Sequence, residues 1–456
     1  MLTHTLRRLV RARWSLSLIG AALTLSACET SSFLEIEDPD IINPSNVQSA
    51  AGANAVRVGA LGRLNSATSG AESFFLLGGL FTDEWINGDS FIGRQEVDQR
   101  AITVQNSFVT DATRAVHRAR LSAQQAIALL EAFNPTAPGW QPAEMYFVQA
   151  FIENLAAEHF CNGLVFSTVV DGVEVYGSPI MVVEAFERAL AHADSGLTLV
   201  TGTTNDDNRV RNALKVVRGR ILMNLNRPAD AATSVTGVPT NFVYNMFHAQ
   251  TATSNQMWNL NNLAWRYSVS DNEGTNGINF ASAADPRLPV CVGGDAVCRA
   301  NGVTRATRDD LTAPLNVQLV WPLRESPVAI TSGIEARMIE AEAQLRAQDA
   351  AGALATLNTA RATVTGLAPL TDAGTDAARV DQLFRERAIW LFGRGYRTGD
   401  MRRLIRQYNR TAASVFPVGP WHKGGNYGVD VTFPIPQAEQ NNPNVPAGQS
   451  CIDRNA

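Results

Sequence analysis

Several features that mark enzymes and nucleic-acid-binding proteins are missing from this sequence. It contains no Walker loop, no His-Glu-x-x-His motif and no Gly-x-Ser-x-Gly motif. Its six histidines lie singly, at no spacing that would bind a metal. The formal net charge is −5, and no stripe of Lys and Arg would release the counterions of a nucleic acid. We therefore predict a protein without catalytic activity, metal or cofactor, which leaves binding as its chemistry.

Long hydrophobic runs are also absent, apart from one near the N-terminus. Residues 14–25 are mostly apolar but too short to span a bilayer comfortably. They follow a basic segment made of Arg7, Arg8, Arg11 and Arg13. This layout predicts a secretory signal peptide over residues 1–27, whose removal would leave the mature chain more acidic than −5. An amphipathic helix that stays on the protein is the alternative.

The apolar stretch ends at Leu25-Ser26-Ala27-Cys28, which resembles a bacterial lipobox. We therefore predict that the chain is cut before Cys28 and that this cysteine is lipidated. Each buried methylene of an acyl chain contributes about 0.8 kcal/mol, so several chains would anchor the protein durably. Residues 28–45 are acidic, contain proline and are expected to form a tether. Residues 46–456 are then the folded body, outside the bilayer.

Cysteine is scarce: only four further cysteines follow Cys28 in the sequence. An exported chain enters a compartment where disulfides form. Cys291 and Cys298 bracket a short Gly-containing loop and are expected to pair, which leaves Cys161 and Cys451 as the remaining pair. A metal site is the alternative, but the cysteines lack Cys-x-x-Cys spacing and a nearby histidine.

Helical periodicity recurs along the body, in segments that come in pairs. Apolar residues three and four apart predict helices over residues 112–133, 142–160, 182–199, 208–226, 334–347, 349–363 and 377–392. Because one pair cannot bury its apolar faces alone, we expect the pairs to stack side by side. The pattern resembles tetratricopeptide-type repeats with an irregular period, and a generic helical bundle is the alternative. The predicted fold is mainly α.

Residues 234–332 lack this periodicity and are rich in Asn, Thr, Gly and Pro. A long segment without regular structure is unusual inside a compact domain and is often functional. We therefore predict an irregular, loop-rich lobe that packs against a helical scaffold formed by residues 46–233 and 333–456, all within one domain.

Five segments together resemble the SusD/RagB family. Residues 384–404 resemble its Arg-rich helix and following turn, with matching positions at Gly395, Arg397, Asp400, Arg402 and Arg403. An acid often precedes the glycine of that turn, and Arg394 stands there in this chain. The other similar segments are FLEIEDP after Cys28, YGSPIMVVEAFERAL at 176–190, DAAGALATLNTAR at 349–361 and FPIPQAEQNNPN at 433–444.

The resemblance implies an outer-membrane lipoprotein that faces the cell exterior. Members of the family are non-catalytic and mostly α-helical, with four tetratricopeptide-like units and an irregular lobe. They sit as a lid on a TonB-dependent, SusC-like transporter, capture glycans or peptides and deliver them to the channel. A tetratricopeptide-type envelope scaffold and a lipoprotein polysaccharide hydrolase are the alternatives. The hydrolase needs a convergent acid pair, and adjacent acids such as Asp83 and Glu84 point apart.

Aromatic side chains beside amides and arginines are suited to sugars, because a flat ring covers the apolar face of a sugar and polar groups bind its hydroxyls. An early loop and the irregular lobe both offer such groups, which predicts ligand contacts by Trp85, Asn87, Arg94, Trp258, Asn262, Trp265 and Tyr267. The alternative is that these aromatics belong to the core. Trp390 lies on an apolar helix face and is predicted to be core, and Asp400, Arg402 and Arg403 are predicted to form internal ion pairs and caps.

Overall fold

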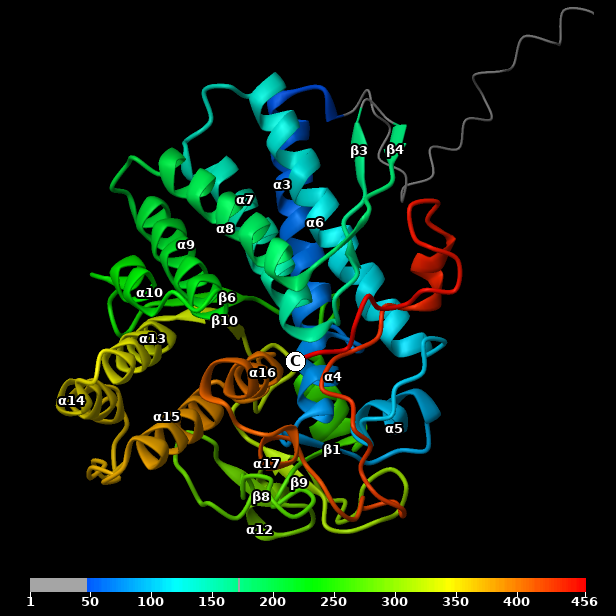
Figure 1. Cartoon of the computed structure of the whole chain (residues 1–456), viewed down its shortest axis with the longest axis vertical. Helices are drawn as coiled ribbons and strands as arrows, with labels where there is room; N and C mark the ends of the chain where they lie inside the picture. The colour runs from blue at the N-terminus through cyan, green and yellow to red at the C-terminus, as the bar shows by residue number, and fades with distance from the viewer. Residues whose placement is uncertain (1–46, 171–172) are drawn as a thin grey trace, which may run out of the picture.

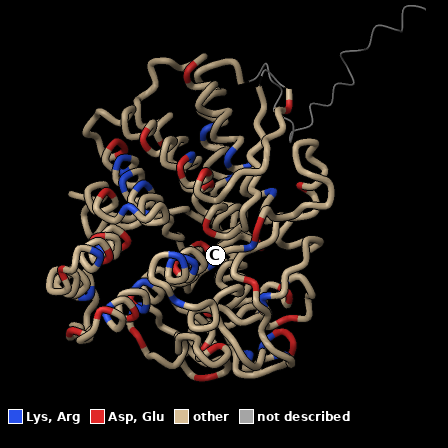
Figure 2. The backbone as a smooth tube through the Cα atoms, viewed as in Figure 1, with Lys and Arg blue, Asp and Glu red and all other residues tan. Residues whose placement is uncertain are grey.

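The computed structural model describes residues 47–170 and 173–456 (Figure 1). The predicted signal peptide, the lipidation site Cys28 and the tether up to residue 45 lie outside the described residues. Within the described ranges, no helix is both long enough and apolar enough to cross a membrane. Acidic and basic residues alternate along the backbone rather than gathering on separate faces (Figure 2).

A curved array of helices forms most of the molecule, which confirms the predicted mainly α scaffold (Figure 1). In chain order, each helix packs on the next, from α6 through α7, α8, α9 and α10 to α13, and α3 packs on α6. The helices span α3 Ala50–Ser69, α6 Ser107–Phe133, α7 Trp140–His159, α8 Val182–Leu199, α9 Asn205–Asn224, α10 Pro228–Val235, α13 Gly333–Arg346, α14 Ala350–Arg361 and α15 Asp376–Trp390. This sequential stacking is the behaviour expected of helical repeats.

Local signals in the sequence explain where these helices begin. Side-chain oxygens of Ser49, Asn106, Ser332 and Thr375 accept hydrogen bonds from the first-turn amides of α3, α6, α13 and α15. Small residues set how closely the helices approach. At Gly196 in α8, an added Cβ would lie 2.8 Å from a methyl group of Leu214 in α9, so a larger residue would push these helices apart.

Two helices near the centre differ from the prediction. Helix α4, Phe74–Phe81, is buried at every position, so its sequence FFLLGGLF has no polar face to reveal a helical period. The last helix predicted from the sequence ends at residue 392, whereas the structure has a further helix, α16, Arg397–Tyr408. Helix α16 is hard to recognise from periodicity because its buried first two turns contain three arginines and an aspartate.

The segment between α10 and α13 contains only short elements. They are β6 Val243–Met246, α11 Gln256–Trp258, η1 Asn259–Leu263, β7 Tyr267–Val269, β8 Val290–Val292, α12 Ala296–Ala300, β9 Asn316–Gln318 and β10 Val328–Ser332. Its antiparallel pairs are β6 with β10 and β8 with β9. A third pair joins β7 to β1, Trp85–Asn87, which comes from the start of the chain. This pairing attaches the irregular lobe to the helical scaffold.

Buried amides hold the lobe together. Asn261 Nδ2 donates to the carbonyls of Tyr267 and Asn316, and Asn261 Oδ1 accepts from the amide of Gln318. Gln318 in turn binds the backbone of Trp321 through both its oxygen and its nitrogen. Side chains therefore satisfy backbone groups that regular strands or helices satisfy elsewhere.

The remaining described elements lie along the edges of the scaffold. They are α5 Ile92–Asp98, β2 Leu164–Val165, β3 Thr168–Val170, β4 Val173–Val175, β5 Pro179–Ile180, α17 Ala412–Val415 and η2 Gln437–Asn441. The C-terminal tail returns to the core, as its Pro-rich sequence predicts: Phe433 is buried and its amide donates to the carbonyl of His159. A disulfide between Cys161 and Cys451 ties the tail to the end of α7.

Candidate functional site

The early loop and the irregular lobe, which the sequence analysis expected to share a ligand site, do meet in the structure. Strands β1 and β7 run antiparallel, with Trp85 opposite Val269 and Asn87 opposite Tyr267. The loop after β1 continues the contact, because Gly88 N donates to the carbonyl of Arg266. Two segments that are about 180 residues apart in the chain therefore form one seam.

Most of the residues predicted to contact ligand are buried in this seam, which corrects their predicted role. Trp85, Asn87, Arg94, Asn262 and Tyr267 have at most 5 % of their surface exposed. The ring centroid of Trp85 lies 4.9 Å from that of Phe392 and 6.2 Å from that of Tyr267. These side chains pack the junction between scaffold and lobe, so they build the frame of a site rather than its surface.

Arg94 and Asn262 have partners within the protein, although Arg94 Nε, Trp85 Nε1 and the Tyr267 hydroxyl are buried without a hydrogen-bond partner among the described residues. Arg94 forms ion pairs with Asp89 and Glu72, and its guanidinium lies 5.5 Å from the ring centroid of Tyr267. Asn262 Oδ1 accepts a hydrogen bond from Gln318 Nε2 at 2.9 Å. Because buried polar groups need such partners, these residues are typical of a folded core with internal hydrogen bonds.

Trp258 and Trp265 are different, because both are half-buried on the lobe. An arginine covers part of each ring: Arg324 lies 5.5 Å from the centroid of Trp258, and Arg305 lies 4.4 Å from that of Trp265. Such cation–π contacts hold the rings in place. Ligand contact by these two tryptophans stays a prediction.

A pocket that the sequence analysis did not predict opens where α15 meets the lobe. Its volume is about 290 Å³. We call it the tryptophan pocket; it is lined by Asn245, Arg287, Val320, Trp321, Pro327, Ala329, Ile389, Trp390, Phe392 and Arg394. Trp390 is half-buried here and packs against the hydrophobic core, in agreement with its predicted place. Aromatic walls with a few polar groups are the usual composition of a small-molecule site.

A tight turn after α15 positions the pocket residues. Gly393 has φ +66°, in the left-handed region that favours glycine, and a Cβ there would lie 3.1 Å from the ring of Trp321. Its amide donates to Glu84 Oε1 at 2.9 Å, which fixes the turn to the segment before β1. Burial raises the pKa of the Glu84 carboxyl to about 8, although the hydrogen bond from Gly393 works in the opposite direction.

Beneath the pocket, buried ion pairs connect α15 to α16. Asp400 binds Arg387 and Arg403, with nitrogen-to-oxygen distances of 2.8 Å in both pairs. Burial alone would raise the pKa of Asp400, but the charges of Arg387 and Arg403 outweigh it and lower the pKa to about 2. This confirms the predicted internal ion pairs of Asp400 and Arg403. Arg402 instead donates to the carbonyls of Ala157 and Glu158.

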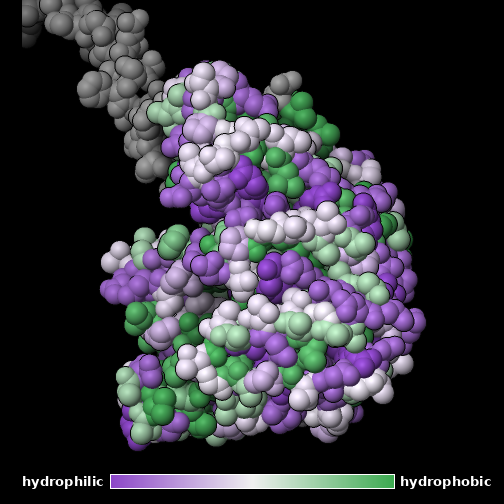
Figure 3. Space-filling model, turned by 90° about the vertical axis from the view of Figure 1, so that its left-hand side faces the viewer, coloured by the Kyte–Doolittle hydropathy of each residue, from purple (hydrophilic) through white to green (hydrophobic). Residues whose placement is uncertain are grey.

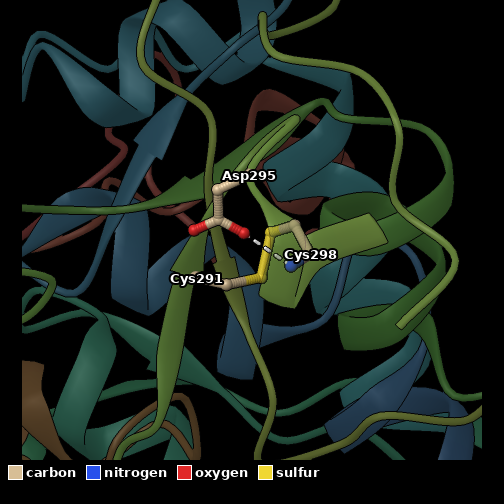
Figure 4. A group of neighbouring side chains, drawn as sticks. All are labelled: Cys291, Asp295 and Cys298. Carbon is tan, nitrogen blue, oxygen red and sulfur yellow. Dashed lines mark hydrogen bonds between the residues drawn. A yellow bond between two sulfur atoms is a disulfide. The ribbon is translucent and has the colours of Figure 1, made fainter. Parts of the chain in front are cut away.

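The cysteines of the lobe do not form a metal site. Cys291 and Cys298 are joined in a disulfide, as predicted, and Asp295 accepts a hydrogen bond from the Cys298 amide at 2.6 Å (Figure 4). Asp295 and the two sulfurs are close enough to hold an ion, but a disulfide offers no thiolate. Asp295 caps α12 instead.

The adjacent acids Asp83 and Glu84 do not form an open catalytic pair. Both are buried: Asp83 binds Arg397 at 2.7 Å, and Glu84 binds the Gly393 amide. The face of the molecule in Figure 3 mixes polar and apolar residues in small areas, with no broad apolar surface. The tryptophan pocket is taken as the candidate small-ligand site because three aromatic side chains, Trp321, Trp390 and Phe392, line it.

Comparisons with known proteins identify the fold. No family model and no curated protein matches the chain. A SusD superfamily protein from Bacteroides fragilis is similar, with TM-score 0.64 and 14 % identity, over 87 % of this chain and 99 % of that one. Another from Parabacteroides distasonis has TM-score 0.65 and 14 % identity, over 87 % and 98 %.

A SusD-like carbohydrate binding protein from Bacteroides vulgatus is also similar. It has TM-score 0.54 and 13 % identity, over 77 % of this chain and 83 % of that protein. The chain therefore has the SusD-type fold, as its sequence motifs indicated.

Proposed function

We propose that this chain is a surface-exposed, lipid-anchored outer-membrane protein that binds nutrient oligosaccharides and delivers them to a TonB-dependent, SusC-like transporter. Peptides are the second nutrient class that its sequence resemblance suggests. The observation that carries the proposal is the SusD-type fold over 87 % of the chain. A similar structure, named as a carbohydrate binding protein, supports saccharide as the ligand.

The tryptophan pocket supports the same proposal in chemical terms. Trp321, Trp390 and Phe392 offer flat apolar walls, and Asn245 and the arginines offer polar groups at the rim. A sugar ring needs both, because its apolar face is bordered by hydroxyl groups. The pocket is slightly smaller than typical ligand sites of roughly 300–1,000 Å³, so it suits one unit of a longer chain.

The proposed mechanism is capture and release without bond breaking. Asp400 and Asp83 are held in buried ion pairs, and the ten residues that line the pocket include no acid that could transfer a proton to a ligand there. Binding by one pocket of modest size gives moderate affinity, which suits a protein that must pass its ligand on to a channel.

The anchor follows from the sequence motif at Cys28. In this proposal the lipid holds the protein at the outer membrane, and residues 28–45 form the tether that leads to the folded body. Replacing Cys28 by alanine is expected to release the protein from carbonate-washed membranes. Full retention of the Cys28→Ala protein would contradict lipid anchoring.

The first experiment is purification of the native protein from membranes in mild detergent, with identification of whatever accompanies it by mass spectrometry. A TonB-dependent barrel in stoichiometric amount is the expected result. A lone protein under the same gentle conditions would contradict the transporter partnership and favour a tetratricopeptide-type scaffold instead.

A further inference from the structure

The charged residues that line the tryptophan pocket are of one sign. Among its ten lining residues, Arg287 and Arg394 are charged, and no acid lines the pocket. This is notable in a chain with more acidic than basic residues, 43 against 38. A cavity with cationic groups and no acid attracts anions, because its low-dielectric walls strengthen the local field.

The two arginines have different surroundings. Arg287 binds Asp285 at 2.7 Å and Glu386 at 2.5 Å, and Glu386 also binds Arg361. These four groups neutralise one another. The guanidinium of Arg287 lies 5.1 Å from the Trp390 ring centroid, so it supports the wall of the pocket rather than supplying net charge.

Arg394 has no such counterion among the described residues. Its one hydrogen bond there runs from Nη2 to the carbonyl of Trp390, and no carboxylate lies within 4 Å of its nitrogens. Burial lowers the pKa of Arg394, but a guanidinium keeps its proton at neutral pH. Its remaining N–H groups are therefore available to a ligand.

The nearest carboxyl groups behind Arg394 belong to Glu84 and Glu335. Both are fully buried and already accept hydrogen bonds, from the Gly393 amide and from the Tyr396 hydroxyl. Burial raises the pKa of Glu84 to about 8 and that of Glu335 to about 7. At neutral pH they compensate the charge of Arg394 only in part.

The aromatic side chains of the pocket lie beside Arg394. Trp321, Trp390 and Phe392 line the same pocket as Arg394. Arg394 thus provides hydrogen-bond donors next to aromatic faces. Donors beside aromatic rings are suited to a ring that carries an acceptor group.

We infer that the tryptophan pocket selects a uronic acid unit of an acidic oligosaccharide, with the carboxylate bound by Arg394 and the sugar ring placed against the aromatic wall. This inference rests on the proposed function and specifies its ligand class. A planar guanidinium matches a carboxylate through two parallel hydrogen bonds, which a neutral sugar cannot form. An acidic peptide shares the carboxylate but lacks a sugar ring whose apolar face is bordered by hydroxyl groups.

The test uses the full-length protein in detergent and calorimetric titration with two matched ligands. One is an oligogalacturonate, and the other is the same oligosaccharide with its carboxyl groups reduced to alcohols. We expect the native protein to bind the acidic ligand at least about tenfold more tightly. Arg394→Gln should abolish this preference while leaving affinity for the reduced ligand within about threefold.

Two further variants separate recognition from folding. Arg394→Lys keeps the charge but loses the planar fork, so we expect it to retain only part of the preference. Arg385→Gln is the matched control, because Arg385 is exposed on α15, the helix before the turn that holds Arg394, and does not line the pocket. It should bind both ligands like the native protein. Melting temperatures of all variants show whether each one is folded.

The possible outcomes distinguish this inference from the proposed function. Equal binding of both oligosaccharides by the native protein overturns the uronic acid inference and leaves saccharide uptake intact. An unchanged preference in folded Arg394→Gln overturns it as well. Arg394-dependent binding of an acidic peptide, with no saccharide binding, overturns it in favour of peptide. A protein that binds none of these ligands and copurifies with no barrel contradicts the proposed function itself.

Discussion

The helical array and the irregular lobe solve the same folding problem by different means. In the array, neighbours in the chain are neighbours in space, and apolar residues such as Val109, Ala112, Val116 and Ala119 of α6 are buried in the core. In the lobe, short strands pair with distant segments, and buried amides such as Asn261 and Gln318 bind the backbone. Stability comes mainly from apolar burial in the first region and from satisfied polar groups in the second.

This difference indicates which substitutions each region tolerates. An apolar core accepts another apolar residue of similar volume at modest cost. A buried amide with several partners has no apolar substitute, because its partners would be left unsatisfied. The binding pocket lies at the border of the two regions, with walls from α15 and from the lobe.

Removing the two disulfides in turn should give the largest difference in stability between the two regions. Cys161–Cys451 joins residues 290 apart and ties the scaffold to the tail, whereas Cys291–Cys298 spans 7 residues within the lobe. Because loop closure restricts the unfolded chain more for a longer loop, replacing both Cys161 and Cys451 by serine should lower the free energy of unfolding by about 5 kcal/mol. Replacing Cys291 and Cys298 should lower it by about 2 kcal/mol. Urea unfolding measures both, and equal losses would contradict the loop-length argument.

Breaking the buried ion pairs of the scaffold should have the second largest effect on stability. Asp400→Asn removes the shared partner of Arg387 and Arg403, whose side chains are buried with it, and should cost about 4 kcal/mol. Asp376→Asn is the control, because Asp376 also pairs with an arginine, Arg379, but its side chain is 87 % exposed. The control should change unfolding by less than about 0.5 kcal/mol. Thermal unfolding that affects both variants equally would show that burial does not determine the effect.

Matched substitutions can compare the amide-rich interior of the lobe with the apolar interior of the helical array. Asn261→Leu replaces a buried amide by an apolar side chain of similar size and leaves three backbone groups unsatisfied, so it should cost about 3 kcal/mol. Leu214→Met in the helical array is the matched change and should cost less than about 1.5 kcal/mol. Hydrogen exchange should show faster opening of β7 and β9 in the asparagine variant. Slower or unchanged exchange there would contradict the role assigned to the amide.

The smallest effect concerns pH at the junction of the regions. The folded-state pKa of Glu84 is raised from 4.5 to about 8, so the folded chain keeps a proton that the unfolded chain loses. Glu84 alone therefore lowers the free energy of unfolding by about 2 kcal/mol as pH rises from 5 to 7, whereas the lowered pKa values of the buried His117 and His159 act in the opposite direction. Over this interval, Glu84→Gln should lose less stability, or gain more, than the native protein. Glu174 is exposed, so Glu174→Gln should keep the native dependence of unfolding free energy on pH. If Glu84→Gln keeps it as well, the raised pKa of Glu84 is contradicted.

Prediction from the sequence succeeded where the relevant signals are local. Helices α7, α8 and α13 begin and end within two residues of their predicted bounds, because apolar spacing and capping residues lie within a few positions of each other. The helix α4 escaped prediction since all its faces are buried and no period remains. Helix α16 escaped it because its interior face is charged, which a hydrophobic pattern cannot reveal.

The candidate site was predicted only in part. The sequence correctly indicated that the segment around Trp85 and the segment around Tyr267 would come together. It did not reveal which of their side chains would be covered, because an aromatic residue beside amides looks the same on a surface and in a polar core. Trp390 packs against the core as its apolar helix face predicts, but the sequence did not reveal the pocket that this side chain also lines.

The sequence by itself determined the helical scaffold, the pairing of Cys291 with Cys298 and the kinship of the fold, since each depends on residues within one short segment or on motifs in a fixed order. Only the tertiary structure decided which polar groups are buried, which tryptophans line a cavity and which arginine lacks a counterion. Those properties depend on what distant segments place against a side chain, and no local pattern records that.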